Sequence, residues 1–520
     1  MRSPRENPPA TTVLDQRCSG ILLHPTSLAG PHGAGDLGPA AHRFAEFLAS
    51  AGQSFWQMLP VGPIGAGNSP YSSPSSYAGS PWLVSLEELA REGLLTRQEL
   101  APPASLARAR RALFDEAREF RGARLWRAFE RFESKPKLSG ELAEFREKNA
   151  AWLPDYALFC ALFDAHGGRA WVEWDEGLRR RRAAALRKAR AELARQVLFH
   201  EFVQFAFDRQ WQALRRRCRS LGLRLLGDVP MFVAPDAIEA WQSPQIFQLD
   251  RSGRPRAVAG VPPDDFNPNG QHWGNPLYRW DVLARTRYEF WVERLGAALT
   301  RFDAVRLDHF IGFHRYWRVP AGSRDAHGGR FVQVDGDRVL RKLRAALGGL
   351  PFVAEDLGMV TEEVRALRDR FGLPGMRVLQ FGFNPGAGEH LPHRYRSRLF
   401  ACTGTHDTDT LVGWFSGLRE RDRKRVLDYL GSRRKDLSWA AMRVILMSVA
   451  NLAVFPLQDV LGLGREARMN RPGTAAGNWE WRAPAGVFTK ELAENLAELC
   501  LTYDRDPRRA SPAAATRAPP

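Results

Sequence analysis

Short apolar runs recur along the chain, and several of them close on a charged or polar residue. Each run is brief and contains aromatic or branched residues, which is typical of a buried parallel strand. Amphipathic helical stretches separate several of the runs, for example at 40–52 and 361–372. Eight strands that alternate with helices predict an α/β fold, a (β/α)8 barrel. The runs are GILLHP (20–25), SFWQMLP (54–60), LRLLGDVP (223–230), FDAVRLDH (302–309), PFVAEDLG (351–358), GMRVLQF (375–381), LFACTGTHD (399–407) and AVFPLQDVLG (453–462).

The uneven spacing of these runs predicts large insertions around the carboxyl-terminal mouth of the barrel. A mainly helical, Arg-rich subdomain is expected over about 84–200, and its end should pack as a barrel helix. The stretch at about 231–285 contains many Pro, Asn and Gly residues, which predicts a loop-rich lid. Long structureless loops are uncommon unless they are functional. We expect one catalytic barrel over 17–504.

The two ends of the chain are polar and rich in Pro and Ala, so we expect disorder over 1–16 and 505–520. The first residues have no apolar core of the kind that a signal peptide contains. The sequence contains no run of about 18 apolar residues, so no membrane span is predicted.

The five cysteines are scattered and none lies in a CxxC pair, which indicates reduced thiols in a cytoplasmic protein. We expect no membrane partner, and a monomer or a weak homo-oligomer.

The charge balance is basic, with 75 Lys and Arg residues against 58 Asp and Glu residues in a chain of 520. Such an excess could indicate a nucleic-acid partner. It is concentrated at 107–111, 179–190 and 419–425, where Ala, Leu or acidic residues interrupt the basic ones. This pattern is typical of solvated helix faces, so we expect no nucleic-acid partner.

Carboxylates stand at the ends of several predicted strands, and the active site of a parallel barrel lies at those ends. Two interpretations compete: a metal site with oxygen and histidine ligands, or carbohydrate chemistry with one attacking and one proton-donating carboxyl group. Rings and amides near the predicted mouth favour carbohydrate, because sugars stack on rings and hydrogen-bond to amides. The carboxylates are Asp228, Asp308, Glu355, Asp356, Asp407 and Asp459. The rings and amides are Tyr71, Trp241, Phe247, Phe266, Gln271, Trp273, Tyr278 and Trp317.

The motifs VRLDH, AEDLG and THD follow one another in this order, and longer motifs surround them. With these motifs the sequence resembles the 4-α-glucanotransferases, also called amylomaltases or disproportionating enzymes, of glycoside hydrolase family 77. The resemblance runs from about residue 18 to about 504. It is carried most specifically by VAGVPPDDFNPNGQHWGNPLYRWD (258–281) and QDVLGLGREARMNRPGTAAGNWEWR (458–482). The segment 328–340 and Thr408 depart from the family's usual pattern.

The resemblance implies roles for residues that match the family's motifs. Asp308 corresponds to the nucleophile, Glu355 to the general acid/base, and Asp407 to the third carboxylate, which holds the sugar hydroxyls. Arg306 precedes Asp308 by two residues on the same strand face, so it can hold the nucleophile ionised. No cofactor or metal is implied. The residues implied to bind substrate are Tyr71, Asp228, Gln271, Trp273, Arg306, His309, His406 and Asn470.

The implied activity is transfer of an α-1,4-glucan segment to the 4-hydroxyl of another glucan or of glucose. It would proceed with retention through a covalent glycosyl-enzyme, which requires the two catalytic carboxyls to lie about 5–5.5 Å apart. The residues alone leave a net hydrolase open, since water can resolve the same intermediate. A glucan-binding protein without catalysis and nucleic-acid binding by the basic helical insertion are further alternatives.

Overall fold

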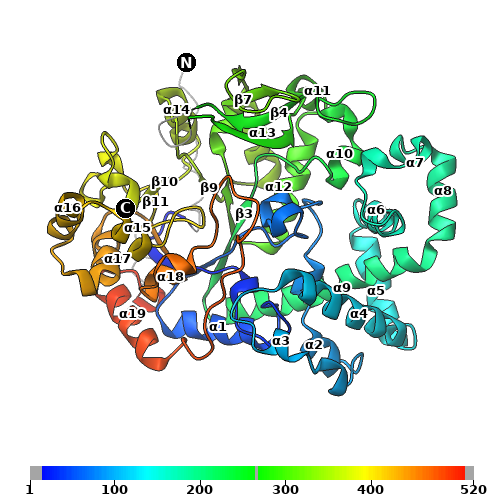
Figure 1. The fold of residues 1–520 in the computed structure, drawn as a ribbon, viewed down its shortest axis with the longest axis horizontal. Helices are drawn as coiled ribbons and strands as arrows, with labels where there is room; N and C mark the ends of the chain where they lie inside the picture. The colour runs from blue at the N-terminus through cyan, green and yellow to red at the C-terminus, as the bar shows by residue number, and fades with distance from the viewer. Residues whose placement is uncertain (1–13, 264–267, 510–520) are drawn as a thin grey trace, which may run out of the picture.

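The computed structural model describes residues 14–263 and 268–509. Eight parallel strands close into a barrel in the order β1-β2-β3-β6-β9-β10-β11-β12 (Figure 1). Each of the eight apolar runs forms one barrel strand, which confirms the predicted (β/α)8 fold. The strands are β1 (Cys18–Leu22), β2 (Phe55–Gln57), β3 (Arg224–Val229), β6 (Ala304–Leu307), β9 (Phe352–Ala354), β10 (Gly375–Val378), β11 (Leu399–Cys402) and β12 (Leu452–Pro456).

Helices surround the barrel and form the insertions. The first insertion contains α2 (Leu86–Arg91), α3 (Ala104–Ala107), α4 (Phe114–Phe132), α5 (Pro136–Lys148), α6 (Leu153–Ala165), α7 (Glu176–Arg179) and α8 (Ala183–Glu192). The helices next to the barrel are α1 (Pro39–Ser50), α9 (Ala194–Ser220), α12 (Glu289–Arg301), α13 (Gly336–Leu347), α14 (Glu362–Arg370), α17 (Leu437–Met447) and α19 (Lys490–Thr502). The remaining helices are α10 (Ile238–Gln242), α11 (Trp280–Arg285), α15 (Leu411–Gly417), α16 (Glu420–Leu430) and α18 (Leu457–Val460).

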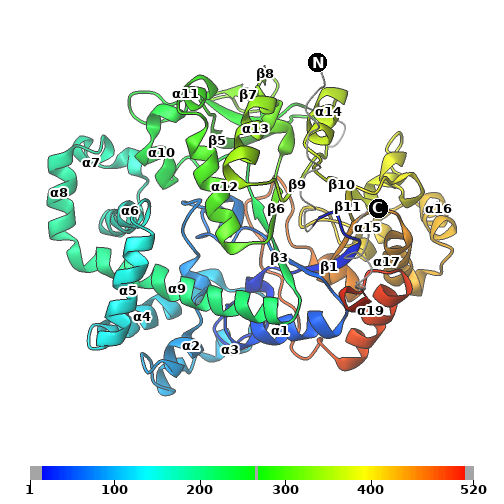
Figure 2. The ribbon, with the colours of Figure 1, turned by 180° about the vertical axis from the view of Figure 1, so that it is seen from behind.

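The helical insertion and the α15–α19 region lie on opposite sides of the barrel, as the front and back views agree (Figures 1 and 2). Helix α9 joins the insertion to the barrel, because its second half buries Trp211, Leu214 and Cys218. The end of the insertion thus packs against the barrel through α9.

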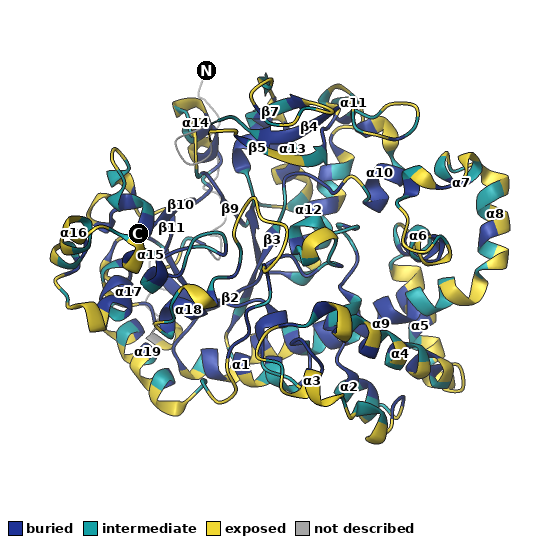
Figure 3. Ribbon diagram, viewed as in Figure 1, coloured by how far each residue is buried: buried dark blue, intermediate teal, exposed yellow. Residues whose placement is uncertain are grey.

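Tight packing fixes the barrel strands, which are buried along most of their length (Figure 3). On β3 a side chain at Gly227 would place its Cβ 2.3 Å from the ring of Phe302. The lack of a side chain there lets Phe302 pack directly on the strand. The neighbouring residue, Asp228, is thereby held at the barrel mouth by a rigid element.

The expectation of a loop-rich lid at 231–285 is wrong in part. Strands β4 (Ala257–Val261) and β5 (Gln271–Pro276) pair there and join β7 (Arg315–Pro320) and β8 (Arg330–Gln333) in an antiparallel sheet of order β5-β4-β7-β8. We call it the lid sheet. The pattern missed it because β5 is polar and β4 pairs with β7, a strand distant in sequence. Residues 264–267, which include Phe266, lie outside the described residues.

The predicted disordered ends are also too long. Leu14 is buried, and Arg505 is 1% exposed. The Arg505 guanidinium donates hydrogen bonds to five main-chain carbonyls near the amino-terminal end of the barrel. Residues 1–13 and 510–520 lie outside the described part of the chain. The five carbonyls belong to Cys18, Leu446, Ser448, Ala450 and Asn451.

Within residues 14–263 and 268–509, no helix combines the length and the apolar character that a membrane crossing requires. All five cysteines lie in this part of the chain and are free thiols. The cytoplasmic location stays a prediction.

Candidate active site

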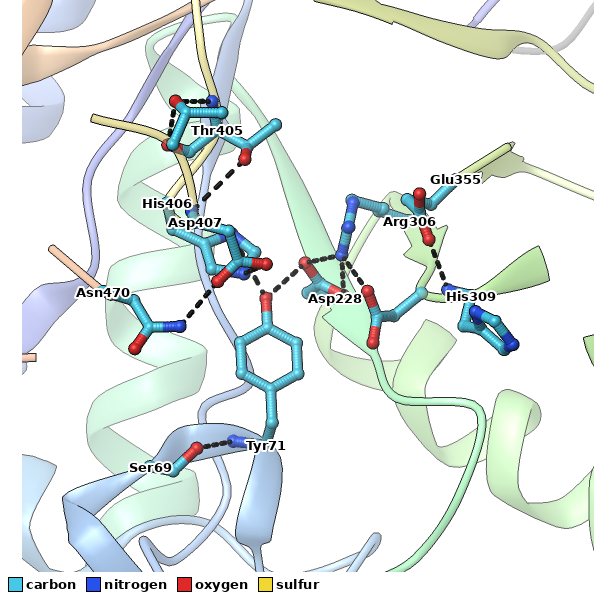
Figure 4. A network of polar contacts seen from close by, with 12 residues as sticks. Ser69, Tyr71, Asp228, Arg306, His309, Glu355, Thr405, His406, Asp407 and Asn470 are labelled. Atoms are coloured by element: carbon cyan, nitrogen blue, oxygen red, sulfur yellow. Dashed lines mark hydrogen bonds and ion pairs between the residues drawn. The ribbon is translucent and has the colours of Figure 1, made fainter. Parts of the chain in front are cut away.

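A buried arginine organises two carboxylates at the barrel mouth. Arg306 Nη1, at the end of β6, lies 2.9 Å from Asp308 Oδ1. The same atom lies 2.8 Å from Asp228 Oδ2 (Figure 4). Arg306 and Asp308 are therefore in direct contact, and the role of Arg306 toward a nucleophile stays a prediction. Asp308 differs from Asp228 in that 28% of its side chain is exposed, whereas Asp228 is fully covered. The geometry leaves Asp308 as the member of this group that a substrate can reach.

The charges of this group depend on burial and pairing together. Burial lowers the pKa of Arg306, but Asp228 and Asp308 outweigh it and raise that pKa well above its usual value. Burial raises the pKa of Asp228 to about 6, although Arg306 opposes the shift. Burial therefore dominates at Asp228 and pairing at Arg306. We favour the ionised pair, since Nη1 lies within 3.0 Å of both Asp228 oxygens.

Glu355 follows β9 and is bound by main-chain donors. Its Oε2 accepts a hydrogen bond of 2.7 Å from His309 N, and its Oε1 accepts one of 3.0 Å from Leu357 N. Burial, assisted by the negative charge of Asp308, raises the pKa of Glu355 to about 7. A carboxyl group with this pKa can both give and take a proton near neutral pH.

Asp407 lies across the mouth, in the loop after β11, and its side chain is 44% exposed. Its Oδ1 accepts a hydrogen bond of 2.6 Å from Asn470 Nδ2, and its Oδ2 lies 3.3 Å from His406 Nε2. Burial would raise the pKa of Asp407, but His406 and Asn470 outweigh it and lower that pKa below its usual value. The group is therefore a fixed anion that accepts hydrogen bonds.

Tyr71 connects the two sides of the mouth. Its hydroxyl donates to Asp228 Oδ2 at 3.0 Å, and its ring stacks on the His406 ring with 4.9 Å between centroids (Figure 4). Trp479, which we did not single out from the sequence, lies 5.8 Å from the Tyr71 ring. It belongs to the GNWEWR motif, so the motif was the signal that could have found it.

The lid sheet reaches the mouth through β5. Trp273 Nε1 donates to Gln271 Oε1 at 3.0 Å, and the Trp273 ring meets the His309 ring edge-on at 4.9 Å. His309 has a left-handed backbone with φ 50°. Burial lowers the pKa of His309 to about 4. A neutral imidazole next to Asp308 can donate or accept a hydrogen bond, as a sugar hydroxyl requires.

The eleven residues implied by the resemblance form two sets of contacts, one around Arg306 and Tyr71 and one around His309, which meet at the chain neighbours Asp308 and His309. Several other candidates lie elsewhere. Trp241, Phe247 and Tyr278 are buried in the core, and Trp317 packs on Phe331 within the lid sheet. The pattern missed this because an aromatic residue near a strand end can equally pack inward.

Two hollows flank the mouth. One, with an empty volume of about 410 Å³, is lined by His24, His406 and Arg468, among other residues. The other, of about 590 Å³, is bounded by Tyr71 and Asp228. Both volumes include space that opens to solvent. In the described part of the chain, no three His, Cys, Asp or Glu side chains are grouped so that they could hold a metal ion.

Comparisons with known proteins agree with the resemblance. The family model described as 4-alpha-glucanotransferase matches residues 23–488. The 4-alpha-glucanotransferase of Thermus thermophilus is 46% identical over 500 residues, which cover 94% of this chain and 99% of that protein. That of Synechocystis is 45% identical over 502 residues, covering 95% and 99%.

A solved structure supports the same assignment. The amylomaltase from Streptococcus agalactiae in complex with acarbose matches with a TM-score of 0.92 and 32% identity. The match covers 94% of this chain and 100% of the other. The chain therefore belongs to the family of 4-alpha-glucanotransferases and is an enzyme of this kind.

Proposed function

We propose that Asp308 is the nucleophile of this 4-alpha-glucanotransferase, Glu355 its general acid/base, and Asp407 the carboxylate that holds the sugar ring. The observation that carries the proposal is the contrast between the first two groups. Asp308 touches a buried cation and is partly exposed, whereas Glu355 has a pKa raised to about 7. A retaining mechanism needs such a pair, one group ionised and the other protonated at the start.

In the first half-reaction Glu355 gives its proton to the glycosidic oxygen while an Asp308 oxygen attacks C1 of the sugar. The C1–O bond breaks, and the shortened glucan leaves with that proton. Arg306, whose Nη1 lies 2.9 Å from Asp308 Oδ1, holds the attacking carboxylate in place by an ion pair. The departing glucan leaves Glu355 ionised and Asp308 bonded to C1.

In the second half-reaction Glu355 takes the proton of an acceptor's 4-hydroxyl, whose oxygen attacks C1 and displaces Asp308. Two inversions give net retention. Glu355 changes from acid to base between the halves, which a pKa of about 7 favours.

Asp407 is proposed to bind sugar hydroxyls through oxygens that Asn470 and His406 hold in place. A fixed anion stabilises the distorted ring only if it is preorganised, because reorientation during the reaction would cost free energy. Tyr71, Asp228, His309 and His406 are proposed to line the donor side of the cleft.

Gln271 and Trp273 are proposed to cover the cleft from the lid sheet. A transferase must bind an acceptor sugar and keep water from the covalent intermediate. Trp273 is 37% exposed above His309, so its ring is available to a sugar face.

The proposed substrates are α-1,4-glucans and maltooligosaccharides. The structurally similar amylomaltase was solved in complex with acarbose, which supports a sugar ligand in this cleft as well. The absence of a nucleic-acid partner and the state as a monomer or weak homo-oligomer stay predictions.

The test is incubation with maltotriose and chromatography of the products, with wild type beside Asp308→Asn. We expect a ladder of longer maltooligosaccharides plus glucose from wild type only. Maltose and glucose without longer products would indicate a net hydrolase. Transfer by Asp308→Asn at the wild-type rate would exclude Asp308 as the nucleophile.

A further inference from the structure

The segment 465–470 lies against the loop that carries Asp407. Asn470 N donates to His406 O at 3.0 Å, and Asn470 Nδ2 donates to the Asp407 carboxylate at 2.6 Å. Arg468 adds two further hydrogen bonds. Its Nη2 donates to Asp407 O at 2.7 Å, and its Nε donates to Asn470 O at 2.7 Å.

The Arg468 guanidinium is thus a bridge between the main chains of Asp407 and Asn470. The group is planar and rigid, so two of its N–H donors fix the spacing of the two carbonyls that they bind. The side chains of the same two residues meet in the cleft. Any change in the main-chain spacing therefore alters how Asn470 holds the Asp407 carboxylate.

The loop after β11 needs such support, because 403–410 is neither helix nor strand. Within it, Thr405 Oγ1 accepts from Asp407 N at 3.2 Å, and Thr408 Oγ1 accepts from Thr405 N at 3.0 Å. These short-range bonds shape the turn. They do not fix its distance from Asn470, which is set by the main-chain bond from Asn470 N to His406 O and by the Arg468 bridge.

Arg465 in the same segment provides a natural comparison. Its Nε lies 2.7 Å from Asp409 Oδ2, and its Nη2 donates to Gly413 O at 3.2 Å. It therefore ties the same segment to the start of α15 without touching Asp407 or Asn470 in any hydrogen bond that the structure shows. A general stabilising role of the segment would be shared by both arginines.

We propose that Arg468 is a positioning residue for the transfer reaction, which sets the Asp407 carboxylate by bridging the main chains of Asp407 and Asn470. The proposal rests on the proposed role of Asp407. Displacing a preorganised group by about 1 Å can cost about 100-fold in rate, even when the altered residue does not touch the substrate.

The experiment measures kcat and KM for maltotriose disproportionation in Arg468→Met, with Arg465→Met as the matched control. We expect kcat to fall by about 10- to 100-fold in Arg468→Met. KM should change by less than about threefold, and Arg465→Met should stay within about threefold of wild type. Equal losses in the two variants would overturn the proposal, because they would indicate general support of the segment. Arg468→Gln, which also lacks the planar fork, replaces Arg468→Met if that variant does not fold.

A second arm asks whether Arg468 acts through Asp407. Arg468→Met is combined with Asp407→Asn, and turnover of an activated glycosyl fluoride donor is measured for the single and double variants. We expect Arg468→Met to cause little further loss in the Asp407→Asn background, because residues that act as one unit are not additive. If Arg468→Met lowered turnover by the same factor in the wild-type and Asp407→Asn backgrounds, the inference about Arg468 would be overturned, whereas the proposed role of Asp407 would stand. Wild-type turnover by Asp407→Asn itself would instead overturn the proposed role of Asp407.

Discussion

Carboxylates at the ends of the barrel strands fall into two groups that look alike in the sequence. The mouth carboxyls, Asp308, Glu355 and Asp407, face the cleft. The anchor carboxyls, Asp356 and Asp459, are 3% and 1% exposed, and Asp459 lies in the short helix α18. The two groups meet most closely at Glu355 and Asp356, which are neighbours in the chain.

Both oxygens of each anchor carboxyl are engaged by the protein, as are those of Glu355 and Asp407, but the kinds of partner differ. Asp356 accepts from Met376 N at 2.7 Å and pairs with Arg368. Asp459 accepts from Thr403 Oγ1 at 2.6 Å and from Leu411 N at 2.7 Å, so it connects β11 to α15. The comparison teaches that a carboxylate at a strand end is available for catalysis only where no distant cation or helix start has taken its oxygens.

The largest expected effect is on turnover at the mouth carboxyls. Asp308→Asn and Glu355→Gln should each lower kcat for maltotriose by about 10⁴-fold or more, because each removes a group that forms or breaks a bond. The melting temperature should stay near that of wild type. The measurement is steady-state product analysis beside thermal unfolding, and a loss below tenfold in either variant would contradict the assignment.

Substitution of an anchor carboxyl is expected to lower stability and to leave turnover nearly unchanged. Asp356→Asn should lower the free energy of unfolding by about 3 kcal/mol, because the buried Arg368 loses one of its two carboxylate partners and keeps only the more exposed Asp369. The folded fraction should keep kcat within about threefold of wild type. Denaturant unfolding and active-site-normalised rates check this, and a folded but inactive Asp356→Asn would break the distinction between the two groups.

The pH dependence should sharpen the comparison. Glu355 must be protonated in the free enzyme, and burial raises its pKa to about 7. Activity that depends on its protonated form is present below that pH and lost above it. The expected kcat/KM therefore falls about tenfold per pH unit above 7.

The control for the pH experiment is a donor with a good leaving group, such as a maltosyl fluoride, which needs no proton from Glu355. With this donor, the fall of kcat/KM above pH 7 should be absent. If kcat/KM fell in the same way above pH 7 with both donors, the ionisation would belong to a group other than Glu355.

A smaller effect is expected at the lid. Trp273→Ala should raise KM for maltotriose about tenfold through the loss of a stacking ring, and kcat should change less. Trp273→Phe keeps an aromatic ring and should stay within about threefold of wild type. Equal KM values for wild type and Trp273→Ala would exclude Trp273 from substrate binding.

The sequence predicted the barrel because each buried strand is a local signal that needs no knowledge of its neighbours. It did not predict the lid sheet, since β4 gains its partner β7 only after the chain has returned from the barrel. Arg505 was missed for the same reason. Its surroundings in the sequence are polar, but its five carbonyl partners come from separate segments.

The candidate site residues came from the resemblance rather than from the pattern. The pattern alone could not separate Glu355 from Asp356, because only Arg368 and Met376, which lie beyond the strand, distinguish them. Arg468 escaped notice for a related reason. Its contacts with Asp407 and Asn470 involve main-chain carbonyls, which no residue pattern reveals.

The most direct test of the account is to identify the residue that carries the covalent glycosyl group. A slow fluorinated maltosyl fluoride would trap the intermediate on the Glu355→Gln variant, whose deglycosylation lacks its base, and peptide mass spectrometry would locate the adduct. We predict one glycosyl group on the peptide that contains Asp308, attached at Asp308. An adduct at Asp228 or Asp407, or turnover with no adduct on any carboxylate, would contradict it.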